Sequence, residues 1–165
     1  MKRLIALTIV LATCIALVGC TMENGAAQIS SEERRRIDLY VQVMTAAFQI
    51  ENGGDGFVAV RLDSLEGLGA DAQQEVLKDL IGLSANVYSF AKVEWDETKF
   101  VYYHGNMAGT INGTVLSVSV EEYSGDAATI AGCSRFGNLG AVFPKYRARY
   151  DSGIWILDMI NMAIS

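Results

Sequence analysis

The stretch TVLSVSVEEYSGDAATIAGCSRF, residues 114–136, decides the fold of this chain. Apolar residues alternate with small or polar ones along residues 114–123 and again along residues 127–136, a pattern typical of strands with one buried face. Ser124-Gly125-Asp126 separates the two runs with residues that favour tight turns. The stretch therefore predicts two antiparallel strands joined by a short hairpin.

The strand pattern continues on both sides of this hairpin. Further strands are predicted at residues 87–91, 100–103, 141–150 and 154–164, with turns at Asn112-Gly113 and Asp151-Ser152-Gly153. We expect the second half of the chain to be a β-meander. Pro144 would suit an edge or a bulge, and residues 154–164 are apolar on both faces, which predicts a central strand.

The first half of the chain predicts two helices around one strand. Ser30 and Glu33 have the spacing of a capping box, and apolar residues then recur at helical spacing until Asn52-Gly53-Gly54. A strand over residues 57–62 and an amphipathic helix ending near Ile81 complete a strand-helix-strand crossover with the strand at 87–91. We therefore expect an α+β domain with two helices packed on a twisted, mostly antiparallel sheet.

The first twenty residues have the layout of an export signal. Lys2 and Arg3 precede an apolar run, residues 4–18, that is shorter than the roughly 20 residues of a transmembrane helix. Leu17-Val18-Gly19-Cys20 resembles the lipobox of bacterial lipoproteins, in which the cysteine thiol receives a diacylglyceryl group and becomes the first mature residue. The alternative is a plain secretory signal peptide that happens to end at a cysteine.

The domain organisation follows from this reading. We expect residues 1–19 to be a lipoprotein signal peptide, residues 20–29 a lipidated tether, and residues 30–165 a single domain outside the cytoplasm. Two acyl chains on Cys20 would hold the protein on the membrane, because each buried methylene contributes about 0.8 kcal/mol. Cys133 would then be the one thiol of the mature chain, which excludes an internal disulfide.

The net charge of the chain limits the classes of molecule that it is expected to bind. The formal charge is −6, and the loss of Lys2 and Arg3 with the signal peptide makes it −8. An acidic domain is a poor candidate for binding nucleic acid. An envelope protein or a wall polymer remains as an expected partner, and the sequence gives no information on the oligomeric state.

Lys145, Arg147 and Arg149 alternate along one predicted strand and so place three cations on one face. This basic stripe is a candidate site for an anionic ligand such as a phosphate-bearing wall polymer. The alternative is cross-strand pairing with acidic neighbours such as Glu121, with about 0.2 to 1 kcal/mol for each pair.

Asp158 lies in a row of apolar residues, which predicts a carboxylate on an apolar face. Burial would force it either to pair with an arginine or to raise its pKa. Such carboxylates occur at functional sites as well as in structural ion pairs.

Other patterns for cofactors, metals and catalysis are weak. His104 is the one histidine, and no nucleophile elbow or metal-ligand spacing accompanies it. Residues 67–72 fit a relaxed dinucleotide fingerprint, but Asp71 would place a carboxylate where pyrophosphate binds the helix N-terminus. We expect no cofactor and no metal.

Several segments resemble a group of uncharacterised lipoproteins of Gram-positive spore-forming bacteria. The segments include Glu51-Asn52-Gly53-Gly54, residues 57–63, Ile111-Asn112-Gly113-Thr114 and, most distinctively, residues 136–146. The resemblance implies anchoring on the outer face of the cell membrane and brings no activity or catalytic residue.

Two functions from different classes fit the sequence. The first is a non-catalytic binding or interaction module of the cell envelope, because a well-formed core occurs without a convergent catalytic set. The second is a small hydrolase or transferase that works through carboxylates such as Asp158 or Glu121.

Overall fold

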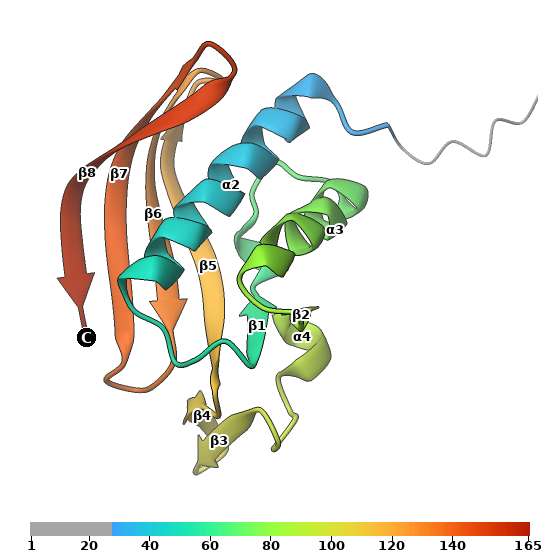
Figure 1. Ribbon diagram of the computed structural model, residues 1–165, viewed down its shortest axis with the longest axis vertical. Helices are drawn as coiled ribbons and strands as arrows, with labels where there is room; N and C mark the ends of the chain where they lie inside the picture. Colours follow the sequence, from blue (N-terminus) through green and yellow to red (C-terminus); the bar gives the residue numbers. More distant parts are fainter. Residues whose placement is uncertain (1–27) are drawn as a thin grey trace, which may run out of the picture.

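The computed structural model describes residues 28–165 (Figure 1). The predicted signal peptide, Cys20 and residues 21–27 of the predicted tether lie outside the described residues. The predicted α+β class is confirmed, since helices cover one face of a six-stranded, mostly antiparallel sheet that ends in a meander.

Five helical segments and eight strands make up the described chain. The helices are α2 (Ser31–Ile50), α3 (Ala70–Asp79) and the short α4 (Phe90–Val93), with 3₁₀ turns at Leu62–Ser64 and Leu80–Gly82. The strands are β1 (Phe57–Val60), β2 (Val87–Ser89), β3 (Phe100–Tyr103), β4 (Asn106–Thr110), β5 (Gly113–Tyr123), β6 (Ala127–Arg135), β7 (Ala141–Asp151) and β8 (Ile154–Ile164).

The large sheet has the strand order β2-β1-β5-β6-β7-β8. Strand β1 pairs parallel with β2 and β5, whereas β5 to β8 form the antiparallel meander. Helix α3 connects β1 to β2, as the crossover pattern predicts. The two strands β3 and β4 form a separate hairpin; strand β4 was not predicted from the sequence.

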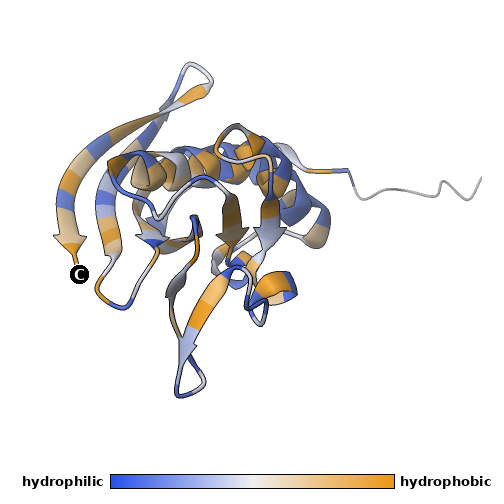
Figure 2. Cartoon of the chain, turned by 60° about the horizontal axis from the view of Figure 1, so that its bottom comes forward, coloured by the Kyte–Doolittle hydropathy of each residue, from blue (hydrophilic) through white to orange (hydrophobic). Residues whose placement is uncertain are grey.

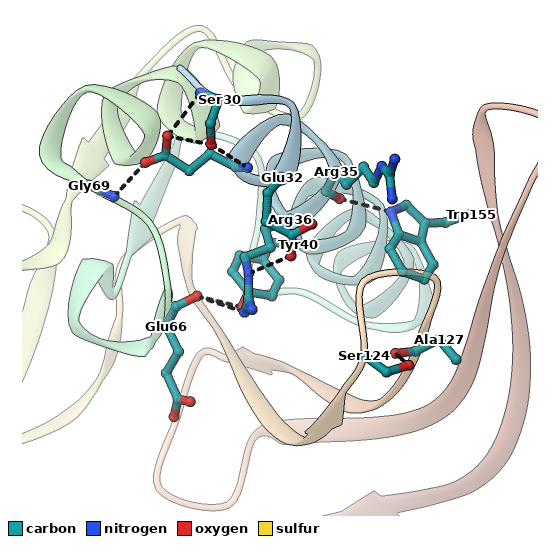
Figure 3. Close-up of polar contacts among 11 residues, drawn as sticks. Ser30, Glu32, Arg35, Arg36, Tyr40, Glu66, Gly69, Ser124, Ala127 and Trp155 are labelled. Atoms are coloured by element: carbon teal, nitrogen blue, oxygen red, sulfur yellow. Dashed lines mark hydrogen bonds and ion pairs between the residues drawn. The ribbon is translucent and has the colours of Figure 1, made fainter. Parts of the chain in front are cut away.

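Helix α2 begins with the predicted capping box. The Ser30 hydroxyl accepts a hydrogen bond from the Glu33 amide at 3.1 Å, and the Ser30 amide donates to the Glu33 carboxylate at 3.0 Å. The second carboxylate oxygen of Glu33 accepts from the amide of Gly69, the residue before α3, at 3.1 Å (Figure 3). One carboxylate therefore fixes the starts of both helices, and these hydrogen bonds lower the pKa of Glu33.

One side of α2 fills the core against the sheet. Its buried residues recur at helical spacing, and side chains of this size each contribute about 1.5–3 kcal/mol when fully buried. They are Ile37, Leu39, Tyr40, Val43, Met44, Ala47 and Phe48.

The helix comes closest to the sheet at Gly132 in β6. A Cβ atom at this position would lie 3.0 Å from both the carbonyl oxygen and a methyl group of Val43, and 3.1 Å from the Cβ of Ala47. Glycine at this point therefore allows the backbones of α2 and β6 to approach each other.

Polar side chains attach α2 to the segments around it (Figure 3). The Tyr40 hydroxyl donates to the carbonyl of Glu66 at 2.7 Å, in the loop before α3. The Trp155 indole in β8 donates to the carbonyl of Arg35 at 2.8 Å. The far edge of the sheet is thereby connected to the first turns of the helix.

The predicted position of residues 154–164 is wrong. These residues form β8, which is the edge strand of the sheet and not a central one. Five of its large apolar side chains are exposed: Ile154, Met159, Ile160, Met162 and Ile164. The prediction failed because apolar side chains on both faces of a strand do not require a neighbouring strand on each side. An edge strand can have the same pattern.

Pro144 lies in β7, an interior strand, at an irregular point of the pairing. The β7–β8 register shifts between Lys145 and Tyr146, next to the proline. The β6–β7 pairs also stop at Lys145 and resume at Val142, as expected because proline has no N–H to donate. Pro144 is therefore not on an edge strand, and the bulge lies next to it rather than at it, with the extra residue in β8.

We predict that Gly132→Ala destabilises the chain by about 1–3 kcal/mol, because the added methyl group must push α2 away from β6. Gly82→Ala is the matched control, since nothing lies within 4 Å of a Cβ at Gly82. Chemical denaturation of both variants measures the difference. Equal free energies of unfolding for Gly132→Ala and the unsubstituted chain would contradict the packing argument.

Candidate functional site

The second face of the sheet is only partly covered. A small cluster of Phe57, Ala59, Val93, Phe100 and Val115 packs α4 and the β3–β4 hairpin against β1 and β5. On the remaining strands, this face has no helix over it in the described chain. The covered and uncovered halves meet along β5 and β6.

A cleft of about 410 Å³ lies at this boundary. The loop of residues 136–140 borders it and is held to the hairpin, because Asn138 donates its amide to the carbonyl of Ala108 at 2.9 Å. Side chains from α4, three sheet strands, the hairpin and the loop line the cleft: Arg61, Phe90, Met107, Val115, Ser117, Cys133, Arg135, Asn138, Ala141, Phe143 and Ser165.

Two arginines line the cleft, and one of them is already paired with a carboxylate. Arg61 binds the carboxylate of Asp63 at 2.9 and 3.3 Å and lies over the Phe90 ring, 5.2 Å from its centre. Arg135 ends β6 and is exposed, with no ion pair to any described residue. No acidic side chain is among the described residues that line the cleft, so Arg135 has no carboxylate side chain to pair with there.

Cys133 is the free thiol of the described chain and lies in the same cleft. Burial raises the pKa of this thiol, although a hydrogen bond with Ser117 and the charges of Arg135 and Arg61 act in the opposite direction. The thiol is therefore protonated at neutral pH. A protonated thiol is a weak nucleophile.

The predicted basic stripe is partly neutralised by its neighbours. Lys145 binds Glu121 at 2.6 Å across the intervening strand β6, and Arg149 binds Asp151 at 3.1 Å. Arg147 forms no ion pair within residues 28–165 and lines a second depression of about 260 Å³ with Glu122. The stripe thus presents one cation without an ion pair rather than three, and Glu122 and Asp158 lie near that cation.

Asp158 does not lie on a buried face, so that prediction is wrong. It is exposed on the edge strand β8, opposite Arg147 in the neighbouring strand. The apolar row was misread because the register shift in β8 moves Met162 and Ile164 to the opposite face from Asp158.

His104, and the carboxylate of Asp96, lie outside the cleft. His104 occupies the exposed turn between β3 and β4 with φ 49°. The Asp96 carboxylate accepts hydrogen bonds from Lys99, at 2.7 Å, and from Thr98, and these bonds lower the pKa of Asp96 to about 2. Across residues 28–165, no three metal-ligating side chains gather at one point. Over the same residues, no helix is both long and apolar enough to cross a membrane.

Sequence reasoning missed Arg61 and Arg135 as members of one site. The signal for Arg135 was present, because Cys133 and Arg135 share the face opposite the buried residues of β6. No spacing could reveal Arg61, which reaches the cleft from the end of β1 through the tertiary fold.

We predict that Cys133 reacts slowly with iodoacetamide, because its raised pKa keeps the thiolate fraction low near pH 8. In a chain with Cys14 and Cys20 replaced by serine, the rate should rise with pH and reach half of its maximum at a higher pH than in the same chain unfolded in denaturant. An equal or lower half-maximum pH for the folded chain would contradict the burial of the thiol.

Comparison with known proteins gives no further assignment. No protein-family model matches the chain, and no curated protein sequence or solved structure matches it. The geometry of the cleft is therefore the basis for the functional proposal.

Proposed function

We propose that the protein is a membrane-anchored, extracytoplasmic lipoprotein that acts as a non-catalytic binding module of the cell envelope, with the cleft as its binding site. The observation that carries the proposal is Arg135, an exposed arginine that forms no ion pair with any described residue and lies in a partly apolar cleft. The lipid anchor is proposed from the sequence around Cys20.

The lining of the cleft favours a ligand that combines an anionic group with an apolar body. The planar guanidinium of arginine binds carboxylate and phosphate groups through two parallel hydrogen bonds. Phe143 and Met107 provide apolar surface next to Arg135. The volume of about 410 Å³ falls in the range of small-molecule sites, so a small ligand or the end group of a polymer or peptide would fit.

The enzymatic alternative finds no geometric support. Its two carboxylates, Asp158 and Glu121, are exposed and lie on β8 and β5, three strand spacings apart. That separation is about 14 Å at the usual spacing between strands. Paired carboxylates in glycosidases face each other at roughly 5 to 10 Å.

The anchor would keep the cleft near the membrane. Ser30, which caps α2, is ten residues from Cys20 in the sequence. A fully extended chain of that length spans at most about 35 Å. A lipidated Cys20 would therefore place the domain within roughly one protein diameter of the bilayer.

The cleft can be tested with 1-anilinonaphthalene-8-sulfonate, a fluorescent probe that joins a sulfonate to an apolar ring system. We predict that the full-length chain binds one probe molecule and that Arg135→Gln weakens this binding about tenfold or more, since a hydrogen bond to a charged group contributes about 1.5–3 kcal/mol. Fluorescence titration measures both affinities.

Arg147→Gln is the matched control, because Arg147 is an unpaired arginine on the same face but outside the cleft. Its affinity for the probe should equal that of the unsubstituted chain. Equal affinities for the Arg135→Gln and unsubstituted chains, or equal losses in the two variants, would overturn the assignment of the cleft.

The anchor is tested in a separate experiment on whole cells. We predict that Cys20→Ser moves most of the protein from the membrane fraction to the soluble or secreted fraction, because the acyl chains can no longer be attached. Fractionation at high salt followed by immunoblotting measures the distribution. Cys133→Ser is the control, and an unchanged membrane share for Cys20→Ser would refute the anchor.

A further inference from the structure

The two edges of the sheet differ in how they are protected. Strand β2 at one edge has three residues, and both α3 and α4 contact it. Strand β8 at the other edge has eleven residues, and no described element pairs with its outer side. Long unpaired edges bind further strands, so folded proteins normally shorten, charge or cover them.

The side chains of β8 give little protection. Asp158 is its one charged residue, and its exposed large apolar side chains range from 43% exposed at Met162 to 65% at Ile164. Figure 2 shows hydrophobic segments along this edge as far as the C-terminal end.

Some backbone N–H and C=O groups of β8 point away from β7, in the direction where a further strand would pair. Ser165 and Ala141 exchange both of their backbone hydrogen bonds, at 3.0 and 3.1 Å. Because such pairs alternate along antiparallel strands, the backbone groups of Ile164 and Met162 point away from β7. The Met162 amide accordingly donates to the side chain of Asn161 at 2.9 Å and not to a strand.

The pairing with β7 defines which face each residue of β8 occupies, since directly paired residues share a face. Before the register shift, Trp155 and Leu157 lie on the helix-covered face, opposite Tyr150 and Ala148. After the shift, Met162 and Ile164 lie on that same face, opposite Pro144 and Val142. The uncovered face carries Ile156, Asp158, Asn161 and Ala163, which lie opposite Arg149, Arg147, Lys145 and Phe143.

We propose that β8 pairs antiparallel with β8 of a second copy of this chain, around a two-fold axis between Met159 and Ile160. This register pairs Trp155 with Ile164 and Leu157 with Met162 on the helix-covered face. It pairs Asp158 with Asn161 on the uncovered face. On both sides of the axis the pairs then join residues from one face, and the two shifted segments meet at the axis.

Charge favours a second copy as the occupant. In this register the Asp158 carboxylate meets an amide, and the two Asp158 side chains stay three residues apart, about 10 Å along the strands. The remainder of β8 is uncharged, so two acidic chains meet at this edge without like charges in contact. An edge with one carboxylate offers little to select a basic peptide.

The symmetry also suits a protein held at a membrane. The two-fold axis of an antiparallel pair is perpendicular to the sheet, so both α2 helices lie on the same side of a continuous twelve-stranded sheet. Gln28, the first described residue, then lies at the same distance along the axis in both copies. Under the proposed anchoring, both chains reach one bilayer without distortion.

Cysteine crosslinking in membranes tests the register. The full-length Cys133→Ser chain is expressed in bacteria with Asp158→Cys, Asn161→Cys or both, and the membranes are treated with diamide. The double variant should form a disulfide-linked dimer, because the paired residues face each other across the axis. Each single variant should remain mostly without a crosslink, since its cysteines are about 10 Å apart in the dimer. The Cys133→Ser chain alone is the control.

A double variant that forms no dimer, single variants that crosslink equally well, or a disulfide to another protein would overturn the proposal.

A second measurement does not depend on disulfide geometry. Light scattering of the full-length chain in detergent should give the mass of a dimer, and Ile160→Lys should raise the dimer dissociation constant at least tenfold, because it places two cations at the axis. Ile81→Lys is the matched control, since Ile81 is also exposed, at 58% against 45% for Ile160, and precedes β2, the strand at the opposite edge of the sheet. This variant should remain dimeric. A monomeric unsubstituted chain, or no effect of Ile160→Lys with circular dichroism unchanged, would contradict the proposal.

Discussion

The contact between α2 and β6 at Gly132 is the constraint on which the rest of the structure depends. Glycine at this position lets Val43 and Ala47 lie directly against the strand, so the helix covers the middle of the antiparallel meander. From there, Tyr40 holds the loop before α3 and Trp155 in β8 reaches the start of the helix. One face of the sheet is thereby covered from β1 as far as Trp155 in β8.

Because α2 and α3 pack on one face of the sheet, much of the other face is left open for binding. The small aromatic cluster around Phe57 and Phe100 occupies only the half nearest β1 and β5. The cleft forms where this cluster ends, which explains why it combines apolar walls with side chains of the uncovered strands. Arg135 and Cys133 face the cleft because their neighbours Ser134 and Gly132 face the helix.

The local elements could be predicted from the sequence, whereas their order in space could not. The capping box at Ser30 and the turn at Ser124-Gly125-Asp126 act over a few residues, and the helix and strands next to them were predicted within a residue or two. The edge position of β8 depends on which strand pairs with which, and alternation within a strand carries no such information. The same limit explains the error at Asp158, where one extra residue in β8 changes the face of every residue after it.

The candidate site was predicted less well than the fold. The sequence drew attention to Lys145, Arg147 and Arg149 because they are neighbours along one strand, but Glu121 and Asp151 neutralise two of them. Arg61 and Arg135 are 74 positions apart in the sequence and meet only through the packing of β1, β5 and β6. A binding site assembled from separate strands leaves no local pattern to read.

The most direct test of the central claim, that the uncovered face binds the ligand, is a map of amide chemical shifts during titration with 1-anilinonaphthalene-8-sulfonate. The account predicts that the shifts concentrate at Ser117, Cys133, Arg135 and Phe143, with little change along α2. Shifts concentrated on the helix-covered face, or spread evenly over the chain, would contradict it.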